Sequence, residues 1–327
     1  MVKEMNKRNL FTFSFKQTYI LGGKLFVLLS ILFMFFCYIS PQYSQGYNAS
    51  LIDKVKRLES IDSSKIVLIG NSNLSFGIRS EEIEAAFGMP VVNMGLHGGL
   101  GNAFHERMAT LNVHEGDIYI ICHTDFSDSG YMEPAEADLA WITLEDHFNL
   151  WRILRKEDIR PMIEAFPNYL KRCITLWING EGNKKDATLD FYNRSVLNEY
   201  GDISWDDTGL EYQALYWNKT DISVPSISDN VVLRLNELNM YLEERGATMV
   251  IAAYPIADSF NTPDLDLYIK FQDELSDKLD AAVISNYADY FYPERFFFNT
   301  KFHLNNEGKS VRTQQLIADL NHYFTTQ

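Results

Sequence analysis

Apolar runs and longer amphipathic stretches alternate along the first third of the chain. Three runs, "SKIVLIG" (64–70), "MPVVNMG" (89–95) and "DIYIICHTDF" (117–126), have the length and β-branched content of buried strands. The amphipathic stretches 80–88 and 100–116 lie between them and predict helices. Strands that alternate with helices indicate a mostly parallel sheet with both faces covered.

The same alternation returns near the C-terminus. Residues 231–247 and 264–280 predict two further amphipathic helices, and residues 248–255 and 281–286 predict the fourth and fifth strands. Residues 305–324 predict a closing helix. The predicted fold is therefore α/β, a three-layer α/β/α arrangement around a five-stranded, mostly parallel, flavodoxin-like sheet.

Residues 127–228 interrupt this pattern and predict a helical insertion after the third strand. Its aromatic residues are consistent with two interpretations, the packing of a helical cap or a platform on which sugar rings stack. The insertion holds all five tryptophans of the chain, Trp141, Trp151, Trp177, Trp205 and Trp217.

A long apolar segment lies near the N-terminus. The run "LFVLLSILFMFFCYIS" ends at Ser40, and counted from Tyr19 the segment has 22 residues. As a helix it is ~33 Å long, enough to cross a hydrocarbon core of ~30 Å. A cleaved signal peptide is the alternative, but Pro41 follows the run directly and no A-x-A-like cleavage site is found there. The sequence therefore predicts an uncleaved transmembrane anchor.

The charge distribution predicts how this anchor is oriented. Residues 1–24 hold five Lys or Arg and one Glu, a net charge of +4, whereas the whole chain carries −15, which leaves −19 for the remainder. An excess of Lys and Arg keeps a flanking segment in the cytoplasm, so the acidic bulk is expected outside the cytoplasmic membrane. The predicted organisation is a cytoplasmic tail (1–18), the anchor (19–40), a lead-in (41–63) and an extracytoplasmic domain (64–327).

The acidic composition and the cysteine pattern exclude several classes of function. Binding to nucleic acid needs Lys and Arg patches, so no nucleic-acid partner is expected. The three cysteines, Cys37, Cys122 and Cys173, form no disulfide framework, and no CxxC or HExxH motif is present. "GGLG" (98–101) lacks the third glycine of a dinucleotide fingerprint. We therefore expect no metal and no organic cofactor.

Polar side chains gather where the predicted strands end. "GNS" (70–72) follows the first strand, "NMGLHGG" (93–99) the second and "CHTDF" (122–126) the third, while "FNTKFHLNNEG" (298–308) precedes the last helix. In an open parallel sheet, ligands bind beyond the carboxyl ends of the strands. These segments therefore form the candidate site, in which Ser72 is either a nucleophile or a turn-forming residue.

In their order and placement, these segments resemble the conserved blocks of the SGNH/GDSL hydrolase superfamily, and especially those of its membrane-anchored branch in bacterial envelopes. The resemblance covers about 65–126 and 229–325 and does not extend to the insertion. It implies that Ser72 is the nucleophile, His303 its base and Gly95 part of the oxyanion hole. It also implies a serine esterase or O-acyltransferase that acts on an envelope glycan or a lipid-linked polymer through an acyl-enzyme, without a cofactor.

The residues agree with this chemistry in part. A serine hydroxyl needs a base that takes its proton, and His303 lies just before a predicted helix whose positive end favours a neutral ring. The backbone N–H groups of Ser72 and Gly95 are candidate oxyanion donors. The family's Asp should lie three or four residues before the His, where this chain has Thr300 and Asn299. An Asn orients an imidazole but does not stabilise imidazolium as a carboxylate does.

The remaining strand-end residues leave alternatives open. Asn71 and Asn93 are candidate substrate-binding residues, and the sequence does not decide which of His123, Thr124 and Asp125 faces the site. The missing carboxylate also suits a second hypothesis, a non-catalytic relative that binds an envelope glycan or a multi-pass membrane acyltransferase.

Overall fold

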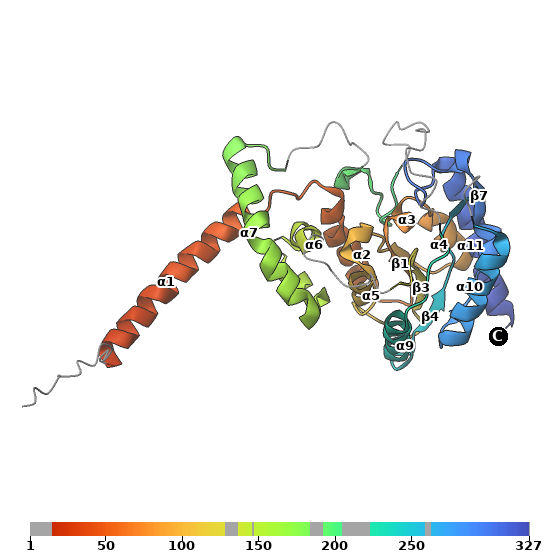
Figure 1. Ribbon diagram of the computed structural model, residues 1–327, viewed down its shortest axis with the longest axis horizontal. Coiled ribbons are helices and arrows are strands. Elements are labelled where there is room, and N and C mark those ends of the chain that lie inside the picture. Colours follow the sequence, from red (N-terminus) through yellow and green to blue (C-terminus); the bar gives the residue numbers. More distant parts are fainter. Residues whose placement is uncertain are drawn as a thin grey trace, which may run out of the picture.

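A long N-terminal helix projects from an α/β domain in the computed structural model of this protein (Figure 1). Helix α1 (Phe15–Ile39) has 25 residues and is long and apolar enough to cross a membrane. It begins four residues before the predicted anchor, so residues 15–18 belong to the helix and not to the tail. The structure describes residues 15–127, 137–145, 147–183, 192–204, 223–258 and 263–326.

The domain is built around a five-stranded sheet in the order β2-β1-β3-β4-β6. All four strand pairings are parallel, and each strand lies within an apolar run of the sequence. The α/β class and the five predicted parallel strands are therefore confirmed. The strands are β1 (Ile66–Gly70), β2 (Val91–Asn93), β3 (Ile118–Cys122), β4 (Thr248–Ile251) and β6 (Ala282–Val283).

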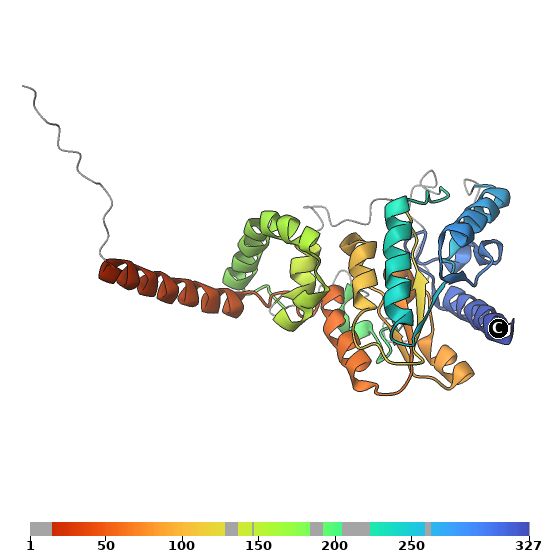
Figure 2. The same cartoon turned by 90° about the horizontal axis from the view of Figure 1, so that it is seen from below.

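One face of the sheet packs against three helices. Alternate residues of β1, Val67 and Ile69, belong to a hydrophobic core shared with α2 (Leu51–Ser60), α5 (Asn102–Met108) and α9 (Asp229–Glu243). Figure 2 shows α9 lying along the strands on this face. Burial of this face explains why half of each strand is apolar.

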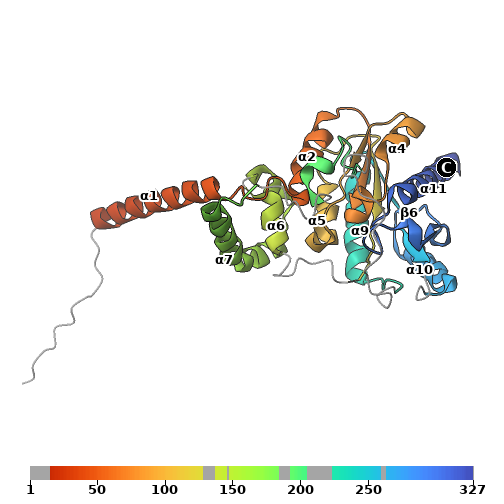
Figure 3. The same ribbon diagram turned by 90° about the horizontal axis from the view of Figure 1, so that it is seen from above.

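The opposite face packs against two other helices. The intervening residues of β1, Ile66 and Leu68, belong to a second core shared with α4 (Ser80–Phe87) and α11 (Asn306–Thr326). Figure 3 shows α4 and α11 on this side, away from α5 and α9. Because both faces are buried, the strands are continuously apolar rather than alternating in polarity.

A second, two-stranded parallel sheet was not predicted. The fourth strand was expected over 248–255, but β4 ends at Ile251 and the chain continues into β5 (Ile256–Asp258), which pairs with β7 (Phe291–Pro293). Pro255 has no N–H to donate to a ladder and so separates the two strands. Helix α10 (Leu265–Lys278) then leads to β6 near its predicted place.

The described part of the insertion contains a helical pair. Helices α6 (Ala137–Leu144) and α7 (Lys156–Asn179) pack together, with Trp141 stacked on Tyr169 at 5.2 Å between ring centroids. The indole of Trp141 also donates to the carbonyl oxygen of Met162 at 2.8 Å. For this tryptophan the packing interpretation holds, whereas Trp205 and Trp217 lie outside the described residues.

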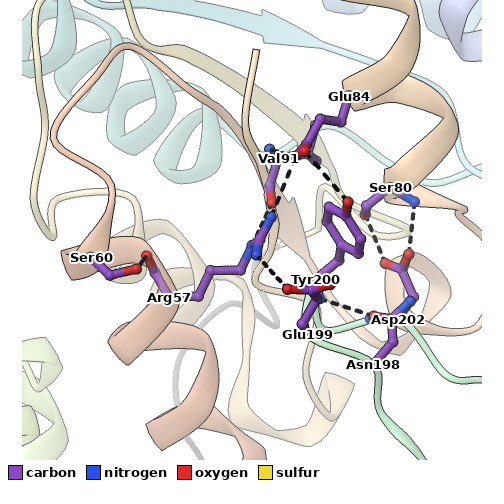
Figure 4. Close-up of polar contacts among 9 residues, drawn as sticks. All are labelled: Arg57, Ser60, Ser80, Glu84, Val91, Asn198, Glu199, Tyr200 and Asp202. Atoms are coloured by element: carbon purple, nitrogen blue, oxygen red, sulfur yellow. Dashed lines mark hydrogen bonds and ion pairs between the residues drawn. The ribbon is translucent and has the colours of Figure 1, made fainter. Parts of the chain in front are cut away.

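A later segment of the insertion, residues 192–204, docks against the sheet edge, where the N–H of Asn93 donates to the carbonyl oxygen of Tyr200 at 2.9 Å. The Asp202 carboxylate accepts hydrogen bonds from the backbone and the hydroxyl of Ser80, at 2.7 and 2.8 Å. Arg57 of α2 lies 3.6 Å from the Glu199 carboxylate of this segment and also reaches the Glu84 carboxylate of α4 (Figure 4). These contacts connect the insertion to α2 and α4, and they fix the direction in which the segment approaches the strand ends.

Candidate active site

Three predicted side chains meet beyond the carboxyl end of β1. Oγ of Ser72 lies 2.8 Å from Nε2 of His303, and Nδ1 of the same ring lies 2.8 Å from Oδ1 of Asn299. Ser72 and His303 are 231 residues apart in sequence. The fold thus brings a hydroxyl, an imidazole and an amide into one hydrogen-bonded chain.

The turn after β1 places Ser72 at the strand tip. Asn71 has extended backbone angles and caps the short helix α3 (Ser72–Ser75), where its Oδ1 accepts from the backbone N–H of Asn73. The strand itself ends at Gly70, where an added Cβ would lie 2.7 Å from the carbonyl oxygen of Cys122. The glycine allows β1 and β3 to approach closely just before the serine.

A buried arginine from the last helix supports this turn. Arg312 of α11 donates to the carbonyl oxygen of Asn73 at 2.7 Å and to its Oδ1 at 2.8 Å. Gly77 makes room for the guanidinium, since an added Cβ would lie 2.4 Å from Nη1 of Arg312. Charge-assisted hydrogen bonds of this kind are strong when buried, so α11 fixes the backbone next to Ser72.

The His303 ring is buried against an aromatic side chain. It stacks on Phe76 with 4.0 Å between centroids and 5° between planes, and its backbone N–H donates to Oγ1 of Thr300 at 3.1 Å. Burial, together with a smaller effect of the nearby His97, lowers the pKa of His303 to about 3. Burial, which disfavours the charged form, is therefore the largest cause of the neutral ring.

The neutral ring fits one tautomer. With the proton on Nδ1, the His303 ring donates to Oδ1 of Asn299 and offers Nε2 as an acceptor to the Ser72 hydroxyl. This is the tautomer in which imidazole acts as a base toward a serine.

Of the two residues at the expected acid position, Asn299 contacts the ring and Thr300 does not. Thr300 accepts from the backbone N–H groups of Phe302 and His303 and so shapes the loop. Nδ2 of Asn299 lies 3.4 Å from Oη of Tyr192 and donates to it, which directs Oδ1 toward the imidazole. Sequence reasoning missed Tyr192, because it belongs to the insertion and no motif marks it.

Gly95 and Asn93 occupy different positions from those predicted. The N–H of Gly95 donates to Oδ1 of Asn93 at 3.0 Å, and a Cβ at Gly95 would lie 2.9 Å from the carbonyl oxygen of Asn71. Asn93 is fully buried and also donates to Asp202 at 2.7 Å. Neither residue lines the cleft beside Ser72. The predicted roles in oxyanion and substrate binding are therefore wrong, and the pair packs the end of β2 against the serine turn.

The residues of the segment 122–126, which follows the third predicted strand, lie partly in the cleft and partly in the interior. Thr124 and Asp125 line the cleft, and Nδ2 of Asn71 donates to Oγ1 of Thr124 at 2.7 Å. His123 instead is fully buried, with Nε2 3.2 Å from Oε1 of Glu106. Asn71 therefore lines the cleft as predicted, and of the three residues left open, Thr124 and Asp125 face the cleft and His123 does not.

The site opens into a cleft of about 490 Å³. A neighbouring cavity of about 330 Å³ shares Thr124, Asp125, Lys301 and Phe302 with it and extends to Tyr254 and Tyr268. Within the described ranges, no group of three or more His, Cys, Asp or Glu is placed to hold a metal ion. Besides Tyr192, the cleft residues that sequence analysis did not name as site residues include His97, Gly98, Asn102 and Lys301.

Comparison of the chain with protein-family models, with curated proteins and with solved structures finds no match. What the cleft does is therefore inferred from its own residues and their geometry.

Proposed function

We propose that this chain is a membrane-anchored serine esterase or O-acyltransferase of the SGNH type, which acts on a cell-envelope glycan or a lipid-linked polymer. The observation that carries the proposal is the pair of 2.8 Å contacts that join Ser72, His303 and Asn299. The strand order β2-β1-β3-β4-β6, with helices packed on both faces, supports a three-layer flavodoxin-like fold, whose ligands bind at this edge of the sheet.

Acylation begins at the serine. Oγ of Ser72 attacks the acyl carbonyl carbon while its proton passes to Nε2 of His303, which gives a tetrahedral oxyanion and an imidazolium. When the intermediate collapses, the bond to the leaving alcohol breaks and the alcohol takes the proton from Nε2. The products of this half-reaction are acyl-Ser72, a neutral His303 and the free alcohol.

The oxyanion is stabilised by backbone N–H groups of Ser72 and Gly98. Each residue opens a helical turn, α3 and the 3-10 helix Gly98–Leu100, and the first N–H of such a turn has no intrahelical partner. Both residues line the cleft, and a Cβ at Gly98 would lie 3.6 Å from Cβ of Asn71. Gly98 thus takes the role that the sequence assigned to Gly95.

Deacylation reverses these steps with a different nucleophile. A hydroxyl group enters the cleft, His303 takes its proton, and the oxygen attacks the acyl carbon of acyl-Ser72. Collapse returns the proton to Oγ of Ser72. Water as nucleophile gives hydrolysis, and a glycan hydroxyl gives transfer. The cleft of about 490 Å³ and its polar side chains suit a sugar-sized acceptor.

Helix α1 anchors the enzyme in the cytoplasmic membrane, with the N-terminus inside and the domain outside. The length and composition of α1 and the basic residues that precede the apolar run support this arrangement. A tether raises the concentration of the site relative to membrane-bound donors and acceptors.

The amide of Asn299 favours a second candidate function. A chain that lacks the carboxylate loses stabilisation of imidazolium, and the same cleft could then bind a glycan without acyl transfer. The chain would in that case serve a multi-pass membrane acyltransferase as its substrate-binding partner.

A fluorophosphonate probe separates the two candidates. The full-length protein in detergent is expected to be labelled at Ser72, as located by mass spectrometry, with labelling lost in Ser72→Ala and in His303→Ala. Ser60→Ala changes an exposed serine on α2 and serves as the matched control. A folded wild-type protein that stays unlabelled would reject the enzyme and leave the binding function.

A further inference from the structure

The insertion contacts the last two turns of α1. If α1 spans a membrane, these contacts lie at the level of the membrane. Phe33 of α1 lies 5.7 Å from Phe148, and Phe35 lies 6.1 Å from Trp177, between ring centroids. Phe33 is six residues before the end of α1 at Ile39, which corresponds to ~9 Å along the helix axis. The rings of Phe148 and Trp177 therefore lie below the end of the span, at the level of its last two turns.

Helix α7 crosses α1 there instead of continuing it, as Figure 1 shows. A third contact, Phe36 to Phe166 at 5.6 Å, fixes the middle of α7 at the same level. The ring of Tyr38 lies 6.2 Å from Trp177. Trp and Tyr are enriched where a span meets the headgroups.

An apolar face of α7 runs next to the face that packs against α6, and Phe166 lies at the border, 5.0 Å from Trp141 of α6 between ring centroids. Ile159, Ile163, Phe166 and Trp177 recur at spacings of four, three and eleven residues, which places them on one face of a helix. Ile163 is 66% exposed and the neighbouring Ile178 is 69% exposed. A helix with one buried and one uncovered apolar stripe and a polar remainder is typical of helices that lie in a membrane interface.

We propose that this stripe of α7, together with Phe148, lies in the membrane leaflet next to the C-terminal end of α1. The occupant of the stripe is the bilayer, because the stripe continues from the surface of the anchor at the anchor's own depth. The inference rests on the part of the proposed function that makes α1 a membrane anchor, and it does not depend on catalysis by Ser72.

The consequence concerns the class of substrate. Helix α6 contacts both α1 and the loop of the cleft. Its Trp141 lies 6.3 Å from Phe36 of α1 between ring centroids, and Cδ1 of its Leu139 would lie 2.7 Å from a Cβ at Gly99. Gly99 follows Gly98 in the loop that lines the cleft. A docked insertion therefore holds the cleft at a fixed height above the leaflet, as a lipid-linked acyl donor or acceptor requires.

Fluorescence quenching in lipid nanodiscs tests the docking. The full-length Cys37→Ser protein carries an environment-sensitive maleimide dye at Ile163→Cys or, as control, at Asn168→Cys, an exposed polar position of the same helix. The two remaining cysteines are buried. Phosphatidylcholine with a doxyl group high on its acyl chain is expected to quench the dye at 163 about threefold more than at 168, and aqueous iodide the reverse.

Three other results would overturn the docking, the anchor or the enzymatic function. Equal iodide quenching at both positions, in protein that has entered the discs, would overturn the docking and leave the stripe as a surface for a membrane protein partner. Failure to enter the discs would overturn the anchor and the docking together. Loss of fluorophosphonate labelling with lipid quenching intact would reject the enzyme and leave this inference standing.

Discussion

The carboxyl edge of the sheet holds two buried histidines with opposite surroundings. His303 is hydrogen-bonded to the Ser72 hydroxyl and to the Asn299 amide, and it lines the cleft. His123 has a carboxylate partner, Glu106, which Arg234 also binds at 2.8 Å, but it is fully buried. The histidine that has a carboxylate partner is thus the one without access to the cleft.

The difference shows what a carboxylate does in each place. Burial raises the pKa of Glu106, but the hydrogen bonds from His123 and Arg234 outweigh it and lower the pKa to about 2. That carboxylate is neutralised by an arginine and joins α5, β3 and α9. A histidine beside a carboxylate is therefore not by itself a reactive site, because the ring also needs a neighbouring hydroxyl and an opening to the cleft. Five substitutions test this contrast.

Exchanging each histidine for glutamine should give the largest difference. His303→Gln removes the base and is expected to slow fluorophosphonate labelling of Ser72 by about 10³- to 10⁴-fold. His123→Gln keeps a hydrogen-bond donor to Glu106, and its labelling rate should stay close to that of the wild type. Rates measured under pseudo-first-order conditions check both, and equal losses in the two variants would contradict the contrast.

Neutralising Glu106 should affect stability and not reactivity. Glu106→Gln leaves Arg234 without its carboxylate and is expected to cost about 3 kcal/mol of unfolding free energy, with labelling of Ser72 unchanged. Chemical denaturation of the full-length protein measures this, with the exposed Glu81→Gln as control.

The pH dependence of that stability has a definite sign. Because the pKa of Glu106 is lowered on folding, its contribution is complete above about pH 4.3, the unfolded value. It is lost as the pH falls towards 2. A Glu106→Gln protein that shows the wild-type loss between these values would refute this assignment.

An acid at position 299 should raise the reactivity of Ser72. Asn299→Asp supplies a carboxylate that stabilises imidazolium and is expected to raise the labelling rate by about 10- to 100-fold, less than the ~10⁴ lost when a protease triad loses its Asp. The gain is smaller because the amide already selects the correct tautomer.

The acid limb of the pH–rate profile should move with this change. In the wild type, His303 has a pKa of about 3, so the labelling rate should persist well below pH 6 and fall only as the ring becomes protonated. A carboxylate beside the ring raises the pKa of His303 and moves the fall to higher pH. An unmoved limb would mean that another group governs it.

The smallest expected effect tests whether Tyr192 orients the amide of Asn299 or acts only through packing. Tyr192→Phe removes the acceptor of Nδ2 of Asn299 and frees the amide to rotate, which should lower the labelling rate about threefold. In the Asn299→Asp background the same change should have almost no effect, because either carboxylate oxygen accepts from Nδ1. A loss of equal size in both backgrounds would mean that Tyr192 acts only through packing.

Much of the fold followed from the sequence because burial on two faces leaves a simple signature. The runs that contain β1 and β3 are continuously apolar, so their place was predictable, whereas β5 and β7 have three residues each and give no comparable signal. The closing helix was predicted at 305–324 and observed as Asn306–Thr326.

The site was predictable where it depends on strand ends and not where it depends on side-chain direction. Ser72 follows a strand tip and His303 precedes the last helix, so their proximity could be expected. Nothing in the sequence reveals that the side chain of Asn93 turns back to the N–H of Gly95. Tyr192 enters from a segment that no motif marks, through contacts at the sheet edge.

The support of the serine turn by Arg312 has a consequence for biosynthesis. The two hydrogen bonds that Arg312 gives to Asn73 join residues 239 positions apart. A ribosome adds ~5–20 residues per second, so the β1 segment is made at least about ten seconds before its supporting helix. On the proposed function, Ser72 becomes reactive only in the finished chain, and a nascent chain that stalls before α11 would expose an unsupported turn.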